Sequence, residues 1–181
     1  MKIIDTHIPD VKIIEPAVYG DARGFFFESF NEQKFRELTG VNLPFVQDNH
    51  SRSSKGVLRG LHYQIEHPQG KLVRVVSGAV IDVAVDLRQS SPTFKKWVAV
   101  ELSSDNHRQL WVPPGFGHGF VVISETADFL YKTTDYWYKE HERSVLWNDS
   151  ELAINWGFSG DVVLSDKDSN APAVRSAELF D

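Results

Sequence analysis

Short apolar runs recur along most of the chain, and Gly, Pro, Asn, Asp and Ser separate them. In residues 79–88, apolar side chains at every second position alternate with Asp82, Ala84 and Asp86. This period of two predicts a strand with one apolar and one mixed face. So many strand-length runs at such regular spacing are typical of a β-sandwich or barrel. The predicted strands cover residues 11–15, 24–30, 44–50, 57–64, 71–76, 79–88, 97–102, 108–112, 118–124 and 127–137.

One internal segment has the pattern of a helix. Asn31 can cap its start, Phe35 and Leu38 form an apolar stripe, and Gly40 can end it. The stretch from Ser159 onward is rich in Ser, Asp, Ala and Pro and is expected to be irregular or weakly helical. No repeat, low-complexity tract or linker divides the chain, so residues 1–181 are expected to form a single all-β domain.

The inner faces of the predicted sheets carry an unusual number of polar side chains. Burying several charges in a sandwich is costly unless they pair or bind something. Two antiparallel sheets with such inner faces would enclose a ligand pocket, as jelly rolls do. The side chains concerned are Arg59, His62, Lys71, Arg74, Asp82, Tyr131 and Trp137.

The segment VLRGLHYQ, residues 57–64, places His62 in an apolar strand. A lone histidine there is more often a core residue with one hydrogen bond than a catalytic group. Strict alternation also puts Arg59 and His62 on opposite faces of the strand. A bulge at Gly60 would bring both to one face, because glycine within a strand often marks a bulge.

The other polar residues also have ordinary explanations when taken singly. Lys71 follows a glycine turn, as surface lysines do. A regular strand over 128–137 would put Tyr131 and Trp137 on one face, either as core or as a pocket wall. Glycines flank His118, which either allows a ligand to approach the backbone or simply forms a turn.

Composition narrows the classes of function. The formal net charge of −6 argues against general nucleic-acid binding. The 41% hydrophobic and 24% charged residues are ordinary for a globular protein, and the absence of cysteine excludes thiol nucleophiles and disulfides. Asp5, His7 and Asp10 interrupt the N-terminal apolar residues, so no signal peptide is expected. No apolar run approaches a membrane helix, and we expect a soluble cytoplasmic protein.

Neither a metal nor an organic cofactor is expected. A metal site on strands would need His-x-His spacing with a carboxylate and a further histidine, whereas the histidines here are scattered singly. The chain also lacks Gly-x-Gly-x-x-Gly, P-loop and Gly-x-Ser-x-Gly motifs. Dinucleotide oxidoreductase, NTPase and serine hydrolase functions therefore have no sequence support.

Eight segments between Gly20 and Asp149, taken in order, carry a closer indication, and the resemblance that they support runs from about Ile8 to Asp168. They are GDARGFFFESFN (20–31), FVQDNHSRS (45–53), VLRGLHYQ (57–64), QGKLVRV (69–75), VIDVAVDLRQSSPTFKKW (80–97), RQLWVPPGFGHGF (108–120), FLYKTTDYW (129–137) and LWND (146–149). In this order the chain resembles the dTDP-4-dehydrorhamnose 3,5-epimerases. The resemblance implies a cupin-like jelly roll, usually a homodimer, without metal or organic cofactor. It further implies conversion of dTDP-4-dehydro-6-deoxy-D-glucose to dTDP-4-dehydro-L-rhamnose in dTDP-L-rhamnose synthesis.

The resemblance also implies roles for individual residues. His62 matches the general base, Asp168 the carboxylate that orients it, and Tyr131 the general acid. Lys71 matches a lysine near the sugar that favours the enolate. The residues implied to line the nucleotide-sugar site are Arg23, Glu28, Gln47, Asp48, Asn49, Arg59, His118, Trp137, Glu142 and Lys167.

Two departures from the family pattern and one dimer contact accompany these roles. Trp137 stands where the family often has the Tyr that stacks on thymine, and Trp stacks at least as well. Gly117 stands where Ala is common. Contacts around Arg23 and Glu28 are implied to reach across the dimer.

The reaction itself requires these residue types. The protons at C3 and C5 flank the C4 ketone, so removing either one gives an enolate. Imidazole suits the abstraction, a buried carboxylate holds its tautomer, and an ammonium stabilises the developing oxyanion. Inversion then requires a separate acid on the opposite face of the sugar, and arginines suit the diphosphate.

Two alternatives stay open at the level of sequence. Relatives that invert only C3 or only C5 of other dTDP-ketosugars share the His–Tyr pair. A non-catalytic cupin that binds a sugar nucleotide is the second, although pure binding requires no acid–base pair. The product could feed lipopolysaccharide or another rhamnose polymer.

Overall fold

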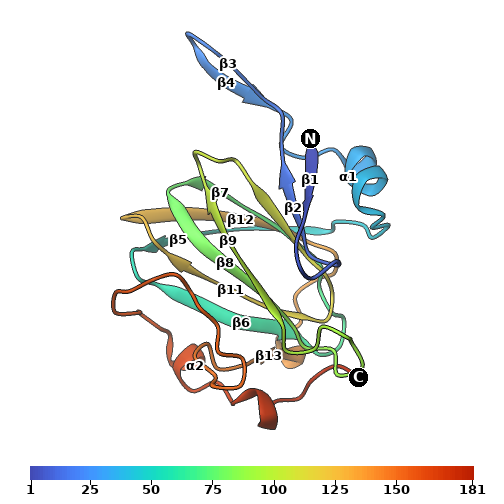
Figure 1. Cartoon of the computed structure of the whole chain (residues 1–181), viewed down its shortest axis with the longest axis vertical. Coiled ribbons are helices and arrows are strands. Elements are labelled where there is room, and N and C mark those ends of the chain that lie inside the picture. Colours follow the sequence, from blue (N-terminus) through green and yellow to red (C-terminus); the bar gives the residue numbers. More distant parts are fainter.

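Two antiparallel sheets face each other across an apolar core in the computed structural model, which describes residues 1–181 (Figure 1). One sheet contains, in spatial order, β1 (Lys2–Asp5), β2 (Lys12–Glu15), β10 (Gln109–Val112), β7 (Lys71–Ser77), β12 (Thr126–Thr133) and β5 (Gln47–Ser54). The other contains β13 (Glu142–Ser144), β6 (Leu58–Gln64), β11 (Phe116–Val122), β8 (Ala79–Asp86) and β9 (Trp97–Ser103). This arrangement confirms the predicted all-β, cupin-like sandwich.

The predicted strands are confirmed in the centre of the sandwich and less accurate at its margins. Strand β5 begins and ends later than predicted, and β11 begins and ends earlier. Strand β12 ends at Thr133, where its pairing with Gln47 and Lys71 on both sides also ends, so the prediction that it reaches residue 137 is wrong. The sequence pattern missed three short strands, which are β1, β13 and β3 (Val18–Asp21).

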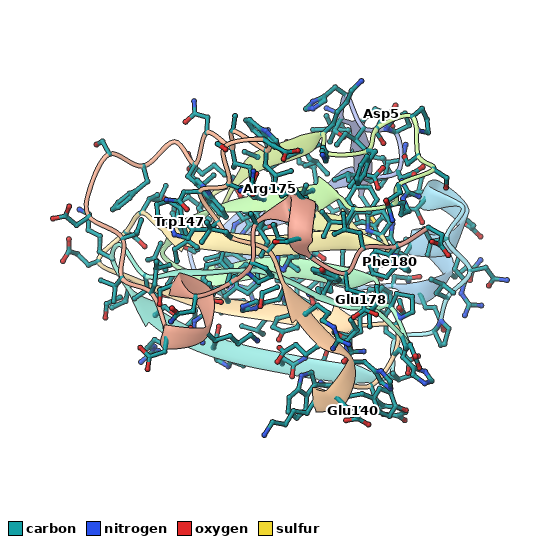
Figure 2. All side chains as sticks on the ribbon, turned by 90° about the horizontal axis from the view of Figure 1, so that it is seen from below. Asp5, Glu140, Trp147, Arg175, Glu178 and Phe180 are labelled. Carbon is teal, nitrogen blue, oxygen red and sulfur yellow. The ribbon has the colours of Figure 1, made fainter.

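Both faces of the alternating strand β8 are buried. Its Val80 and Ala84 face the core between the sheets, whereas Val83 and Val85 pack under the C-terminal part of the chain. Figure 2 shows this C-terminal part crossing the sandwich in front, with Trp147, Arg175 and Phe180 along it. As expected, it is largely irregular and contains only the short helix α2 (Asp166–Ser169) and the 3-10 turn η2 (Val174–Ser176).

The predicted helix is α1 (Glu32–Thr39). Asn31 Oδ1 accepts from the Lys34 N–H at 3.0 Å, and Gly40 ends the helix in the left-handed region at φ 73°. Phe35 is buried against Trp111 on the outer face of the six-stranded sheet, whereas Leu38 is exposed and does not extend the predicted stripe. No helix in the structure is long and apolar enough to cross a membrane.

A two-stranded hairpin extends away from the sandwich just before this helix (Figure 1). It pairs β3 with β4 (Gly24–Phe27), which ends three residues earlier than predicted. Tyr19, Phe25 and Phe26 on it are 69%, 62% and 73% exposed. Such large aromatic side chains on a projecting hairpin are typical of a surface that another molecule covers.

Candidate active site

A bulge in β6 brings Arg59 and His62 into the same cavity. His62 pairs with His118 on β11, but Arg59 pairs with Phe120, so two residues of β6 stand opposite Gly119 alone. Gly60 lies in this bulge at φ 129°. A Cβ at this position would lie 2.8 Å from the His118 carbonyl oxygen, so the bulge needs glycine. The predicted bulge is confirmed, and both side chains line one cavity.

His62 and Asp168 form a hydrogen-bonded pair at the wall of this cavity. His62 Nε2 lies 2.5 Å from Asp168 Oδ1. Asp168 is buried and sits in α2, where its backbone N–H donates to the capping Ser165 Oγ at 3.2 Å. Burial lowers the pKa of His62 below its usual value in spite of the carboxylate. A neutral imidazole that donates Nε2–H to Asp168 keeps its lone pair on Nδ1.

Tyr131 and Lys71 enter the same cavity from the opposite sheet. They lie on the adjacent strands β12 and β7. Burial, followed by the nearby Glu142 carboxylate, raises the pKa of the Tyr131 phenol, which therefore stays protonated at neutral pH. Burial lowers the pKa of Lys71 to about 8. Lys71 Nζ lies 3.5 Å from the His62 carbonyl oxygen, which places the ammonium beside the histidine's own backbone.

A second histidine–aspartate pair lies deeper between the sheets. His118 Nε2 is 3.0 and 3.1 Å from the two carboxylate oxygens of Asp82. Asp82 is fully buried, and burial raises the pKa of its carboxyl group.

Arg74 lies on the outer face of its sheet with Leu72, so the expectation that it faces inward is wrong. The alternation along β7 explains this, because Lys71 and Val73 occupy the inner face.

Two adjoining cavities of 260 and 280 Å³ share four residues, Asn49, His62, Lys71 and Tyr131. The first is further lined by Gln47, Tyr63, Gln64, Gln69, Trp137 and Glu142. The second is further lined by His50, Ser51, Arg59, His118, Phe120 and Phe129. The candidate acid and base therefore lie where the two cavities meet.

Trp137 reaches the first cavity from a loop and not from the end of β12. It is 52% exposed, and its backbone N–H donates to Gln47 Oε1 at 3.2 Å. Glu142 lines the same cavity and pairs with Lys167 Nζ at 2.7 Å, which brings Lys167 beside the site. Sequence reasoning missed Tyr63, Gln64 and Gln69 here, because nothing distinguishes them from ordinary strand-end and loop residues.

Three of the residues implied to bind the nucleotide sugar lie away from both cavities. Arg23 contacts Asp21 on the projecting hairpin, and Glu28 pairs with Lys34. Asp48 pairs with Lys132 on the outer face of the six-stranded sheet. None of the three lines either cavity within this chain.

No group of three or more histidine, aspartate or glutamate side chains is arranged to hold a metal ion. The His62–Asp168 and His118–Asp82 pairs each contain a single imidazole.

Comparison with known proteins gives consistent matches over almost the whole chain. A sequence model of the dTDP-4-dehydrorhamnose 3,5-epimerase family matches residues 5–176. The dTDP-4-dehydrorhamnose 3,5-epimerase of Pseudomonas aeruginosa is 58% identical over 99% of both chains. The crystal structure of dTDP-6-deoxy-D-glucose-3,5-epimerase from Legionella pneumophila, in complex with dTDP-4-keto-L-rhamnose, is 55% identical with a TM-score of 0.95, covering 97% of this chain and 93% of that one.

A more distant solved structure differs in its described reaction. It is a 3'-monoepimerase from Streptomyces bikiniensis in complex with dTDP-quinovose. It is 33% identical with a TM-score of 0.89, covering 95% of this chain and 87% of that one. The fold therefore occurs with one inversion as well as with two.

Proposed function

The chain belongs to the dTDP-4-dehydrorhamnose 3,5-epimerase family, and we propose that His62 and Tyr131 transfer the protons in its reaction. It is an isomerase that epimerises dTDP-4-dehydro-6-deoxy-D-glucose at C3 and C5 in dTDP-L-rhamnose biosynthesis. The observation that carries the proposed mechanism is the His62–Asp168 pair, which shares one cavity with Tyr131 and Lys71.

In the proposed mechanism His62 acts as the base. The neutral imidazole removes the proton on the carbon beside the ketone, and the electron pair of the C–H bond moves onto the C4 oxygen as an enolate. The imidazolium formed is stabilised by Asp168, and the Lys71 ammonium favours the enolate charge. Tyr131 enters from the opposite sheet and supplies a proton to the other face of the carbon, which inverts it. The enolate electron pair forms the new C–H bond, which leaves His62 as an imidazolium and Tyr131 as a phenolate. Once proton exchange with solvent has restored both groups, the same step at the second carbon completes the 3,5-epimerisation.

We assign the nucleotide to the cavity that contains Trp137. Its half-exposed indole offers a face for the thymine, and Gln47 and Asn49 line the same wall. Arg59, His118 and Lys167 bring donors to the site, and cationic donors suit a diphosphate.

We further propose that the active enzyme is a homodimer in which the hairpin β3–β4 reaches the partner. Its exposed aromatic residues need a cover, and the hairpin projects away from its own sandwich (Figure 1). Arg23 and Glu28 would then contact a nucleotide in the partner's cavity, which explains why they lie far from the cavities of their own chain. A cytoplasmic location also stays a prediction.

The competing functions differ in what they exchange with solvent. A single-position epimerase, as described for the Streptomyces bikiniensis protein, would remove one proton of the sugar. A non-catalytic sugar-nucleotide-binding cupin would remove none.

The test is incubation with dTDP-4-dehydro-6-deoxy-D-glucose in deuterium oxide, with a chelator present. We expect deuterium at both C3 and C5, because each inversion passes through its own enolate. His62→Ala should incorporate none while keeping its fold. Tyr131→Phe should keep part of the exchange but lose most inversion, since abstraction needs only the base. Label at one carbon would contradict the 3,5 assignment, and normal inversion by Tyr131→Phe would remove Tyr131 from the mechanism.

A further inference from the structure

The segment that carries Trp137 has almost no backbone hydrogen bonds of its own. Residues 134–138 form neither helix nor strand. Within 136–138, the Tyr138 carbonyl alone accepts a backbone hydrogen bond, from the His141 N–H at 3.1 Å. Since Trp137 is also half exposed, neither secondary structure nor close packing fixes its position. Its place at the cavity must therefore depend on side chains that bind the segment.

Gln64, at the end of β6, makes two of these bonds, while Gln47 Oε1 and Asp135 Oδ1 accept from the Trp137 and Tyr136 N–H groups. Gln64 Oε1 accepts from the Tyr138 N–H at 2.6 Å, and its Nε2 donates to the Tyr136 carbonyl at 3.1 Å. Nε2 also donates to the His67 carbonyl at 2.8 Å, in the loop that follows β6. One buried amide thus holds the peptide groups on both sides of Trp137 and ties them to a second loop.

This arrangement is specific to a glutamine side chain. Two donors and an acceptor are needed in one plane, and the partners fix which end of the amide is which, because only Oε1 can accept and only Nε2 can donate. Gln64 is 3% exposed, and removing its amide would leave the Tyr138 N–H and the Tyr136 and His67 carbonyls without this partner. The loop after β6 and the segment that carries Trp137 also contact each other through the rings of His67 and Tyr138, whose centroids are 4.6 Å apart.

We propose that Gln64 is a positioning residue that holds Trp137 in place for the nucleotide base. The proposal rests on the proposed function, in which Trp137 stacks on the thymine. Gln64 acts through Trp137 and not on the reacting carbons. Its loss should therefore weaken nucleotide binding while the chemical step continues at saturating substrate.

The experiment is a double-mutant cycle on the purified enzyme with dTDP as the probe. Wild type, Gln64→Leu, Trp137→Ala and the double variant are compared by calorimetric Kd for dTDP and by kcat and KM. We expect Gln64→Leu to raise Kd about fivefold or more, with kcat within about twofold of wild type. In the Trp137→Ala background the same change should alter Kd by less than about twofold.

Gln69→Leu serves as the matched comparison. Gln69 lines the same cavity but donates to the Asp135 carbonyl at 2.9 Å, two residues before Trp137. Its loss should raise Kd less than the loss of Gln64 does. Equal effects of the two substitutions would mean that the loop needs general support, and this would count against a particular role for Gln64.

The remaining outcomes separate this proposal from the proposed function. An unchanged Kd in Trp137→Ala would refute the stacking role itself. The positioning role alone would be refuted if Trp137→Ala weakens dTDP binding while Gln64→Leu leaves its Kd unchanged. It would also be refuted if Gln64→Leu raises Kd equally in the wild-type and Trp137→Ala backgrounds, or if it lowers kcat without changing Kd. If Gln64→Leu does not fold, Gln64→Glu replaces it. The glutamate anion still accepts from the Tyr138 N–H but cannot donate to the two carbonyls. The same changes in Kd and kcat are expected for this variant.

Discussion

At the scale of single residues, burial sets the protonation states that the proposed mechanism needs. It lowers the pKa of His62 and keeps the imidazole neutral, and it raises the pKa of Tyr131 and keeps the phenol protonated. The same cause lowers the pKa of Lys71 to about 8, so this ammonium begins to lose its charge just above neutral pH. One physical effect thus prepares a base, an acid and a cation whose charge depends on pH.

A bell-shaped pH profile of kcat/KM follows from these shifts. Activity should fall as pH decreases through the lowered pKa of His62, below 6.5, because the protonated ring cannot accept a proton. Activity should also fall as pH rises through about 8, because neutral Lys71 no longer favours the enolate. Lys71→Arg should lose this second limb, since a guanidinium stays charged. A wild-type profile that stays flat above pH 8 would leave Lys71 without its proposed role.

At the scale of elements, the sequence predicts the presence of strands better than it predicts their boundaries or which side chains face the core. The alternation in β8 and the glycine in β6 are local signals, and both the strand and the bulge are confirmed. Strand β12 ends where its neighbours end, which is a property of the sheet and not of its own residues. Trp137 lines a cavity with His62 and Tyr131, and its role as a nucleotide contact stays a prediction, whereas its predicted place on the strand is wrong.

Gly60→Ala tests the bulge as a structural element. At φ 129° a new Cβ would lie 2.8 Å from the His118 carbonyl oxygen, so β6 must shift and carry Arg59 and His62 with it. We expect a loss of about 1–3 kcal/mol in the free energy of unfolding and a fall in kcat of tenfold or more, as rough magnitudes for strained backbone and misplaced catalytic groups. Chemical denaturation and steady-state kinetics measure the two effects.

Gly40→Ala is the matched control for this substitution. Gly40 also has a positive φ, of 73°, but a Cβ there would meet nothing within 4 Å. It should lose roughly 1 kcal/mol of stability and keep its activity. If Gly60→Ala instead behaves like Gly40→Ala, the bulge does not position the site.

At the scale of the whole molecule, the candidate site is assembled from segments that no local pattern connects. His62 and Tyr131 lie on opposite sheets, and Asp168 comes from a short helix in the irregular C-terminal part. Periodicity predicts a sandwich with a polar interior, but it does not predict which inner faces meet. The resemblance supplied these partners, and it also named Arg23 and Glu28, which this chain does not bring to its own cavities.

A mixing experiment tests whether each site is completed by the partner's hairpin. His62→Ala removes the base, and Arg23→Ala removes the hairpin cation, so each homodimer should have low activity. Co-refolding equal amounts of the two variants makes about half of the dimers heterodimers. One of the two sites in each heterodimer combines an intact His62 with the other chain's intact Arg23. About a quarter of wild-type activity per subunit should therefore return. Light scattering should give about twice the 20.6 kDa of the chain. If the activity of the mixture stays at the average of the two separate variants, Arg23 acts within its own chain or not at all. A fully active species of 20.6 kDa would exclude a site shared between two chains.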